Sequence, residues 1–122
     1  MVQSVVILCD RSPVGTNVAA EALRIGAGLA GLGEMLDCKV VYSGDAVLLL
    51  AKAARFEAVG QDPVGDALEM AELADLPIWV LDEALEDAGL TREDLVDYEA
   101  LEVVDVRRVA GALAEADASF RY

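Results

Sequence analysis

The sequence predicts an α/β fold, a three-layer α/β/α domain with a mostly parallel, five-stranded sheet, over residues 1–122. Short apolar runs of strand length alternate along the chain with helical patterns, which is typical of parallel βαβ units. The first run, Ser4–Cys9, is continuously apolar after its serine, as expected for a strand that is covered on both faces. A chain of 122 residues is a usual length for one domain. We find no internal repeat or linker, and therefore expect a single domain.

The first half of the chain predicts one right-handed βαβ unit followed by a further helix. Apolar residues at three- and four-residue steps after Thr16 or Asn17 predict the crossover helix, which either residue could cap. The expected elements are a strand at Ser4–Cys9, a helix ending near Gly31 or Gly33, a strand at Cys38–Ser43 and a helix at Ala46–Arg55.

The second half predicts three more strands, separated by helices. Thr91–Asp94 has the spacing of a capping box, in which two side chains bond the first turn of a helix. The expected elements are a loop at Glu57–Gly65, a helix at Asp66–Leu73, a strand at Pro77–Leu81 with Trp79 in the core, a short helix at Asp82–Asp87, a strand at Leu101–Val104, a helix at Asp105–Ala116 and an edge strand at Ser119–Tyr122.

The charge of the chain is strongly negative and unevenly spread. It has 9 Lys and Arg against 23 Asp and Glu, a net charge of −14. Residues 1–60 have a net charge of −1, and residues 61–122 one of −13. Nucleic-acid binding depends on Lys and Arg contacts to phosphates, so we expect no direct nucleic-acid partner. The hydrophobic content of 56% is high for this length and predicts apolar interface patches, and hence an oligomer.

Several classes of protein are excluded or disfavoured by residues that the sequence lacks. It has no histidine, which excludes a Ser-His-Asp or Cys-His nucleophile and an HExxH zinc site within one chain. We expect no metal and no cofactor. No apolar stretch is long enough to span a bilayer, and the N-terminus lacks the pattern of a secretory signal. We therefore expect a cytoplasmic protein without membrane contact, whose two cysteines are thiols.

In a parallel sheet, chemistry lies beyond the carboxyl ends of the strands. The first two strands end near Asp10 and Gly44, and the third near Asp82. The expected pocket edge consists of Pro13, Gly15, Thr16, Gly44 and Asp45, and Cys9 is the one candidate thiol there. Strand alternation nevertheless favours a buried Cys9. Cys38 is expected at the opposite end of the sheet, roughly 15 Å away at about 3.3 Å per residue, too far for a disulfide.

Three other functional interpretations of the sequence are weaker. Gly26–Gly31 matches the GxGxxG string of dinucleotide sites, but it lies inside the expected first helix instead of between a strand and a helix, which favours close helix packing. A phospho-acceptor receiver domain would need a pair of acids after the first strand, where only Asp10 stands, and a lysine after the last. Phosphatase chemistry would need an arginine six residues after Cys9 or Cys38, and both positions are glycine.

The order and spacing of four segments resemble the DsrE/DsrF-like sulfur-relay family over essentially the whole chain, nearest the DsrF/TusC type. These segments are Ser12–Thr16 with the small-residue helix after it, Val41–Val47, Ile78–Leu81 leading to Ala84, Leu85, Gly89 and Leu90, and the closing Ala118–Tyr122. The resemblance implies a compact, Rossmann-like α/β subunit. It also implies an assembly that passes persulfide sulfur between cysteines in tRNA thiouridine synthesis or sulfur metabolism.

The resemblance also bears on the catalytic residue and on partners. In DsrE- and TusD-type members the transferring cysteine lies near the end of the third strand and in the helix after it. Here Trp79–Leu85 contains no cysteine, so that role cannot be assigned to any residue. The implied function is an accessory, non-catalytic subunit that assembles with DsrE/TusD-like and DsrH/TusB-like subunits or with itself. The alternative is a small α/β enzyme or a nucleotide-binding module.

Overall fold

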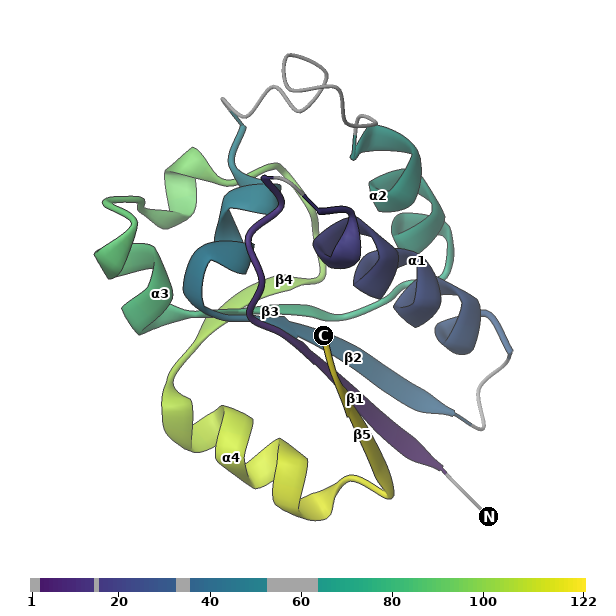
Figure 1. Cartoon of the computed structure of the whole chain (residues 1–122). Coiled ribbons are helices and arrows are strands. Elements are labelled where there is room, and N and C mark those ends of the chain that lie inside the picture. Colours follow the sequence, from purple (N-terminus) through teal and green to yellow (C-terminus); the bar gives the residue numbers. More distant parts are fainter. Residues whose placement is uncertain (1–2, 15, 33–35, 53–63) are drawn as a thin grey trace.

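The computed structural model describes residues 3–14, 16–32, 36–52 and 64–122. Its centre is a five-stranded sheet in the order β4-β3-β2-β1-β5, with every neighbouring pair parallel (Figure 1). The strands are β1 (Ser4–Cys9), β2 (Asp37–Tyr42), β3 (Ile78–Leu81), β4 (Leu101–Val104) and β5 (Ala118–Arg121). The predicted parallel sheet is confirmed, and β5 lies at its edge as expected.

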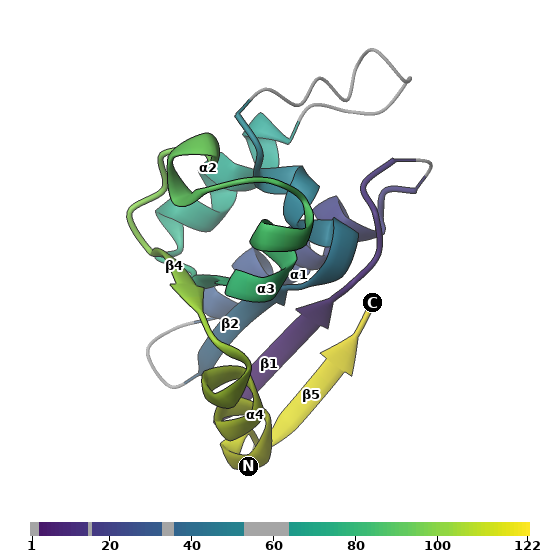
Figure 2. The ribbon, with the colours of Figure 1, turned by 90° about the vertical axis from the view of Figure 1, so that its left-hand side faces the viewer.

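Helices cover both faces of the sheet, which confirms the three layers. They are α1 (Val18–Ala30), the 3-10 helix η1 (Gly44–Leu50), α2 (Gly65–Leu73), α3 (Asp82–Asp87), the short 3-10 helix η3 (Arg92–Asp94) and α4 (Val106–Glu115). Side chains of α1, η1, α2 and α3 share the larger core with Ile7, Val40 and Val80. Among the helices that the structure describes, only α4 covers the other face, where Val109 packs against Val6. Figures 1 and 2 show α4 apart from the other helices.

Local signals account for most element boundaries. The bounds of β1, α3 and β4 agree with the prediction at both ends. Helix α1 begins after Asn17 and ends at Gly31, and α4 begins after Asp105, whose carboxylate accepts a hydrogen bond from the Arg108 N–H. The capping box at Thr91 is present, with Asp94 as its second member. No helix in the described part of the chain is long and apolar enough to cross a membrane.

The predicted helix at Ala46–Arg55 is wrong. The chain forms a 3-10 helix over Gly44–Leu50 instead, and Ala51 then makes an isolated antiparallel bridge with Leu95. Four of the seven residues of this segment are buried, so it lacks the single apolar stripe of an amphipathic α-helix. Residues 53–55, and 57–63 of the predicted loop at Glu57–Gly65, lie outside the described residues, while Gly65 begins α2.

Trp79 is buried, as predicted, and two cations flank its ring. The Nζ atom of Lys39 and the Cζ atom of Arg108 each lie 4.7 Å from the ring centroid. Arg108 also pairs with Glu102 on the neighbouring strand β4. No pattern in the sequence indicates this arrangement, because the three residues come from β2, β3 and α4.

Raising the salt concentration from low to about 0.2 M should raise the melting temperature. Residues 61–122 carry 17 Asp and Glu against 4 Lys and Arg, and the ion pairs seen in the described residues involve only four of the chain's acids. Screening of like charges within a Debye length of about 10 Å at 0.1 M therefore favours the folded state. Thermal unfolding followed by circular dichroism tests this, and a melting temperature that falls with added salt would contradict it.

Candidate functional site

The carboxyl ends of β1 and β2 meet, as the sequence predicts. The Ser43 N–H donates a hydrogen bond to the Cys9 carbonyl at 2.9 Å. Gly44 follows with φ of +53°, and a Cβ atom at this position would lie 3.3 Å from the Asp10 carbonyl oxygen. The left-handed backbone and this close approach both require glycine. Gly44 therefore lets the start of η1 lie directly against the end of β1.

The remaining predicted pocket-edge residues differ in their exposure. Pro13 is buried, Thr16 is half-buried, and Asp45 is exposed in the first turn of η1. The Thr16 hydroxyl accepts a hydrogen bond from the Val18 N–H at 3.2 Å, so it helps to start α1. Gly15 lies outside the described residues. In this arrangement Pro13 and Thr16 serve the fold of the loop between β1 and α1.

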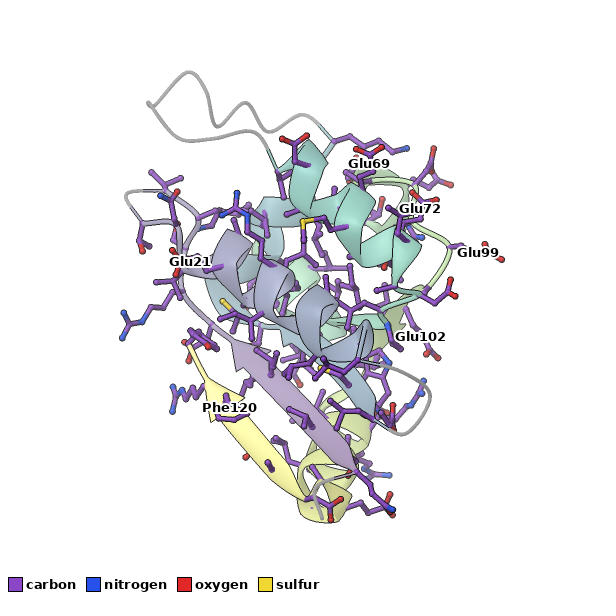
Figure 3. All side chains as sticks on the ribbon, turned by 90° about the vertical axis from the view of Figure 1, so that its right-hand side faces the viewer. Glu21, Glu69, Glu72, Glu99, Glu102 and Phe120 are labelled. Carbon is purple, nitrogen blue, oxygen red and sulfur yellow. The ribbon has the colours of Figure 1, made fainter. Side chains whose placement is uncertain are left out.

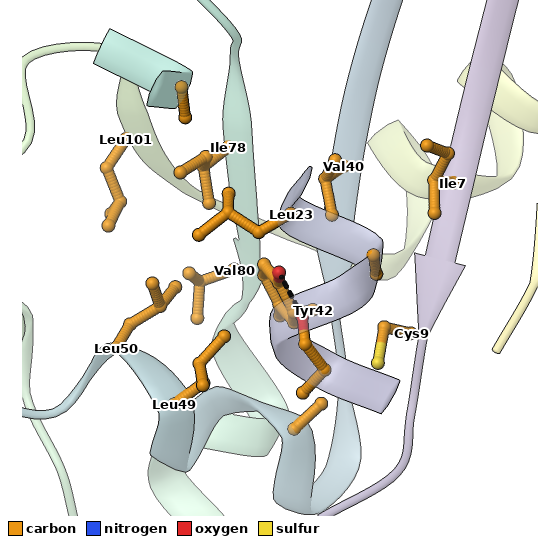
Figure 4. Packing of buried hydrophobic residues seen from close by; sticks show 14 of the residues in the cluster. Ile7, Cys9, Leu23, Val40, Tyr42, Leu49, Leu50, Ile78, Val80 and Leu101 are labelled. Carbon is orange, nitrogen blue, oxygen red and sulfur yellow. Dashed lines mark hydrogen bonds between the residues drawn. The ribbon is translucent and has the colours of Figure 1, made fainter. Parts of the chain in front are cut away.

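Cys9 is fully buried at the end of β1. It pairs in register with Tyr42 of β2, and both side chains belong to the larger core, under α1 (Figure 4). Burial raises the pKa of the Cys9 thiol, and the nearby N–H and guanidinium of Arg11 offset this only in part. Cys9 is therefore a neutral, packed thiol at neutral pH, as strand alternation predicted.

Tyr42 completes the surroundings of Cys9, and the sequence analysis did not single it out. Its hydroxyl donates a hydrogen bond to the Ala19 carbonyl in the first turn of α1 at 2.9 Å (Figure 4). Burial, together with the neighbouring Cys9, raises the pKa of Tyr42 well above its usual value. Aligning the ends of the two predicted strands pairs Cys9 with Ser43, whereas the observed β2 ends one residue earlier and pairs Cys9 with Tyr42.

Cys38 lies at the opposite end of the sheet, as predicted. It pairs in register with Val5, four residues before Cys9 on β1, and is 2% exposed. Burial, with the charge of Asp37, raises its pKa to about 11. Four residues of strand correspond to about 13 Å, so the two thiols cannot form a disulfide, and both are free. The chain thus presents neither of its two cysteines to solvent.

The last strand brings a further charged pair to this edge. A guanidinium nitrogen of Arg121 lies 2.6 Å from a carboxylate oxygen of Asp10. The Tyr122 N–H donates to the Leu8 carbonyl, and the Tyr122 carbonyl accepts from the Asp10 N–H. Asp10 is thereby engaged by β5, and its neighbours in the sequence, Cys9 and Arg11, form no acidic pair of the receiver type with it.

The turn from β3 into α3 presents acids instead of a thiol. Asp82 is exposed and its carboxylate accepts a hydrogen bond from the Glu83 N–H at 2.7 Å. Glu83, Glu86 and Asp87 of the same helix are exposed, so this face of α3 is acidic and solvated. Among the described residues, no three acidic or sulfur-bearing side chains are placed to hold a metal ion. This segment therefore presents carboxylates and no thiol.

The glycine string lies inside α1, and its first member is a packing residue. A Cβ atom on Gly26 would lie 2.5 Å from a Val40 methyl and 3.1 Å from a Leu76 methyl. Gly28, two residues along the same helix, has nothing within 4 Å of that position. The string is not placed between a strand and a helix, so it is not a dinucleotide fingerprint.

Substitution of these two glycines by alanine should change stability in opposite directions. Gly26→Ala should cost about 1–2 kcal/mol, because overpacking against the β-branched Val40 outweighs the better helix propensity of alanine. Gly28→Ala should instead stabilise the protein by about 0.5–1 kcal/mol. Urea denaturation of both variants measures the difference. Equal stabilisation by the two substitutions would show that α1 does not depend on close approach at Gly26.

Comparisons with known proteins agree with this architecture. The YchN protein of E. coli has a TM-score of 0.80 at 19% identity, and the match covers 98% of this chain and 99% of that one. MTH1491, a protein of unknown function from Methanobacterium thermoautotrophicum, has a TM-score of 0.66 at 15% identity over 100% of both chains. A search of the curated proteins found no match. The family model of the DsrE/DsrF-like family matches residues 3–122, so the chain belongs to that family.

Proposed function

We propose that this chain is an accessory, TusC-like subunit of a sulfur-relay assembly, which supports persulfide transfer without carrying the sulfur itself. Family membership supports a role related to sulfur relay. The observation that carries the accessory role is the burial of both thiols, at 0% exposure for Cys9 and 2% for Cys38. A persulfide carrier must expose a thiolate to its donor and its acceptor.

The place of the transferring cysteine in DsrE- and TusD-type members supports the same proposal. In this chain the corresponding segment is the end of β3 and the start of α3, where Asp82 and Glu83 are exposed. The two carboxylates would raise the pKa of a thiol beside them and so disfavour the thiolate that persulfide transfer needs. The sulfur-bearing cysteine then belongs to another subunit, of the DsrE/TusD type, with a DsrH/TusB-like subunit or further copies of this chain completing the assembly.

The proposal is tested by mixing the chain with a DsrE-type subunit that carries a cysteine after its third strand. We expect a stable complex by size-exclusion chromatography with light scattering. We also expect faster persulfide loading of that subunit by a cysteine desulfurase when this chain is present. An unrelated acidic protein of similar size serves as the control. Failure to bind any such subunit, with no effect on its loading, would contradict the accessory role.

A further inference from the structure

The helix α4 and the strand β5 together bury few side chains. α4 has one buried residue, Val109, whereas α1 has five. None of the four residues of β5 is buried. Only Ala116 and Asp117 separate the two elements, so we call residues 106–122 the α4–β5 strap. Segments with few buried apolar contacts are commonly the first parts of a protein to open.

Two carboxylate contacts hold β5 against β1, one at each end of the strand. The Asp117 carboxylate accepts hydrogen bonds from the N–H groups of Gln3 and Ser4, at 2.7 and 3.0 Å. The Asp117 N–H in turn donates to the Ser4 hydroxyl at 3.0 Å. At the other end of β5, Arg121 pairs with Asp10. Both contacts lie at the surface, so water solvates the separated groups and no charge is left buried when they open.

α4 lies on the sheet over a separate, small cluster. The Cζ atom of Arg108 lies 4.7 Å from the centroid of the Trp79 ring, and Arg108 pairs with Glu102. Beneath α4, Val109 packs against Val6. The larger core contains no buried residue of the strap, as far as the structure describes the chain. The rest of the chain can therefore keep its larger core when the strap leaves the sheet.

The strap and the rest of the chain have net charges of opposite sign. Residues 106–122 have a net charge of +1, with three Arg against one Glu and one Asp, and residues 1–105 one of −15. Figure 3 shows Glu69, Glu72 and Glu99 on the acidic part, away from β5. The field of the acids attracts the strap, and salt screens this attraction over about 10 Å at 0.1 M. Added salt should therefore loosen the strap, although it stabilises the acidic remainder.

The strap also covers the edge of β1 at Cys9. The Tyr122 N–H donates to the Leu8 carbonyl, and the Tyr122 carbonyl accepts from the Asp10 N–H, at 2.9 and 3.2 Å. In a parallel ladder, a residue that bonds both neighbours of another residue lies beside it, so Tyr122 lies beside Cys9. Tyr122 packs against the core cluster that contains Cys9. Opening of the strap removes this neighbour and leaves the end of β1 at an open edge.

We propose that the α4–β5 strap undocks from the sheet as one unit while the rest of the chain stays folded, and that this opening controls access to Cys9. Asp117 acts as the clasp, because it lies at the joint between α4 and β5 and bonds the start of β1. Salt shifts the balance between the closed and the open strap. This inference goes beyond the proposed function and does not depend on it, since the strap can open whether or not the chain takes part in sulfur transfer.

Hydrogen exchange of single amides, followed by NMR, tests whether the strap opens as a unit. The strap amides to be measured are those of Ala116, Asp117 and Tyr122. They should exchange at least about tenfold faster than the Val40 N–H, which bonds the Pro77 carbonyl. They should also share one urea dependence, weaker than that of Val40, because opening of the strap exposes less surface than unfolding. Fast exchange at Tyr122 alone would mean fraying of the strand end, and rates equal to that of Val40 would mean global unfolding only; either result would overturn the proposal.

Two matched variants test the clasp. Asp117→Ala should speed exchange of the strap amides and of Val40 alike, by about tenfold, because both the open strap and the unfolded chain have released the clasp. Asp94→Ala removes another exposed carboxylate, to which the Thr91 N–H and hydroxyl donate at 2.8 and 3.2 Å. It should speed exchange at Val40 and leave the strap amides unchanged, because η3 stays folded when the strap opens. Equal acceleration of the strap amides by the two variants would overturn the proposal.

Alkylation of the two native cysteines tests access to Cys9. Iodoacetamide should reach Cys9 through the open strap, and Cys38 only on global unfolding. Raising NaCl from about 0.02 M to about 0.5 M should therefore speed modification of Cys9 about threefold and slow that of Cys38. Peptide mass spectrometry measures both sites in one sample. Rates that change in the same direction at the two cysteines, or no change at Cys9, would overturn the proposal.

Discussion

Iodoacetamide should modify Cys9 and Cys38 at least about 10³-fold more slowly in the native protein than in the unfolded chain. Both side chains are buried, so the reagent reaches them only when the protein opens. Opening of a stable domain costs about 5 kcal/mol or more, which corresponds to that factor. Mass spectrometry of samples quenched at intervals, with and without urea, measures both rates at one pH.

An exposed thiol on the same fold provides the control for this measurement. Asp82→Cys places a cysteine in the exposed first turn of α3 and should react at a rate near that of the unfolded chain. Rapid labelling of native Cys9, at a rate close to that of Asp82→Cys, would mean that the end of β1 opens readily. It would then be Cys9, and not another subunit, that offers a thiol for sulfur chemistry.

The second large effect is a loss of stability at alkaline pH. Burial raises the pKa of Cys38 from 9.0 to about 11, and that of Tyr98 from 10.0 to about 12. Both groups ionise at lower pH in the unfolded chain than in the folded protein. Their contribution to the free energy of unfolding is therefore complete below pH 9 and is lost as the pH rises from 9 to 12. For Cys38 alone, the loss between pH 9 and 11 amounts to about 2 kcal/mol.

Urea denaturation at pH 8 and pH 11 measures this loss, and Cys38→Ala separates the cysteine from the tyrosines. The variant should be less stable than the wild-type protein at pH 8, because it leaves a small cavity, and should lose less stability on going to pH 11. An equal loss in both proteins would assign the alkaline transition to the other buried groups whose pKa is raised, which are Tyr98, Tyr42 and Cys9. It would also mean that Cys38 ionises in the folded state without penalty.

The sequence predicted the sheet well because its strands carry strong local signals. Continuous apolar runs marked β1 and β3, and an acid stands at the predicted start of α3 (Asp82) and of the last helix (Asp105). The parallel orientation of the strands followed from the alternation of strands and helices along the chain. The family resemblance was equally accessible, because it rests on the order of several short segments. The segment after β2 was predicted wrongly, because its leucines and alanines favour an α-helix whereas burial on several sides imposes a 3-10 turn.

The candidate site was predicted less completely, because its contacts join segments that are far apart in the chain. The pairing of Asp10 with Arg121 depends on β5 lying beside β1, which spacing alone does not specify. The two cations over Trp79 likewise come from β2 and α4. The burial of Cys9 was predictable from strand alternation. The role of Gly26 against Val40 required the crossing of α1 over β2, which only the folded structure reveals.

The most direct test of the accessory, non-carrying role is persulfide loading of this chain alone. The protein is incubated with a cysteine desulfurase and L-cysteine, and its intact mass is measured without reductant. We expect no added sulfur on the wild-type protein and one added sulfur on Asp82→Cys, whose exposed thiol a persulfide donor can reach. A stoichiometric gain of one sulfur by the wild-type protein, abolished by Cys9→Ser but not by Cys38→Ser, would contradict the account and make Cys9 the acceptor.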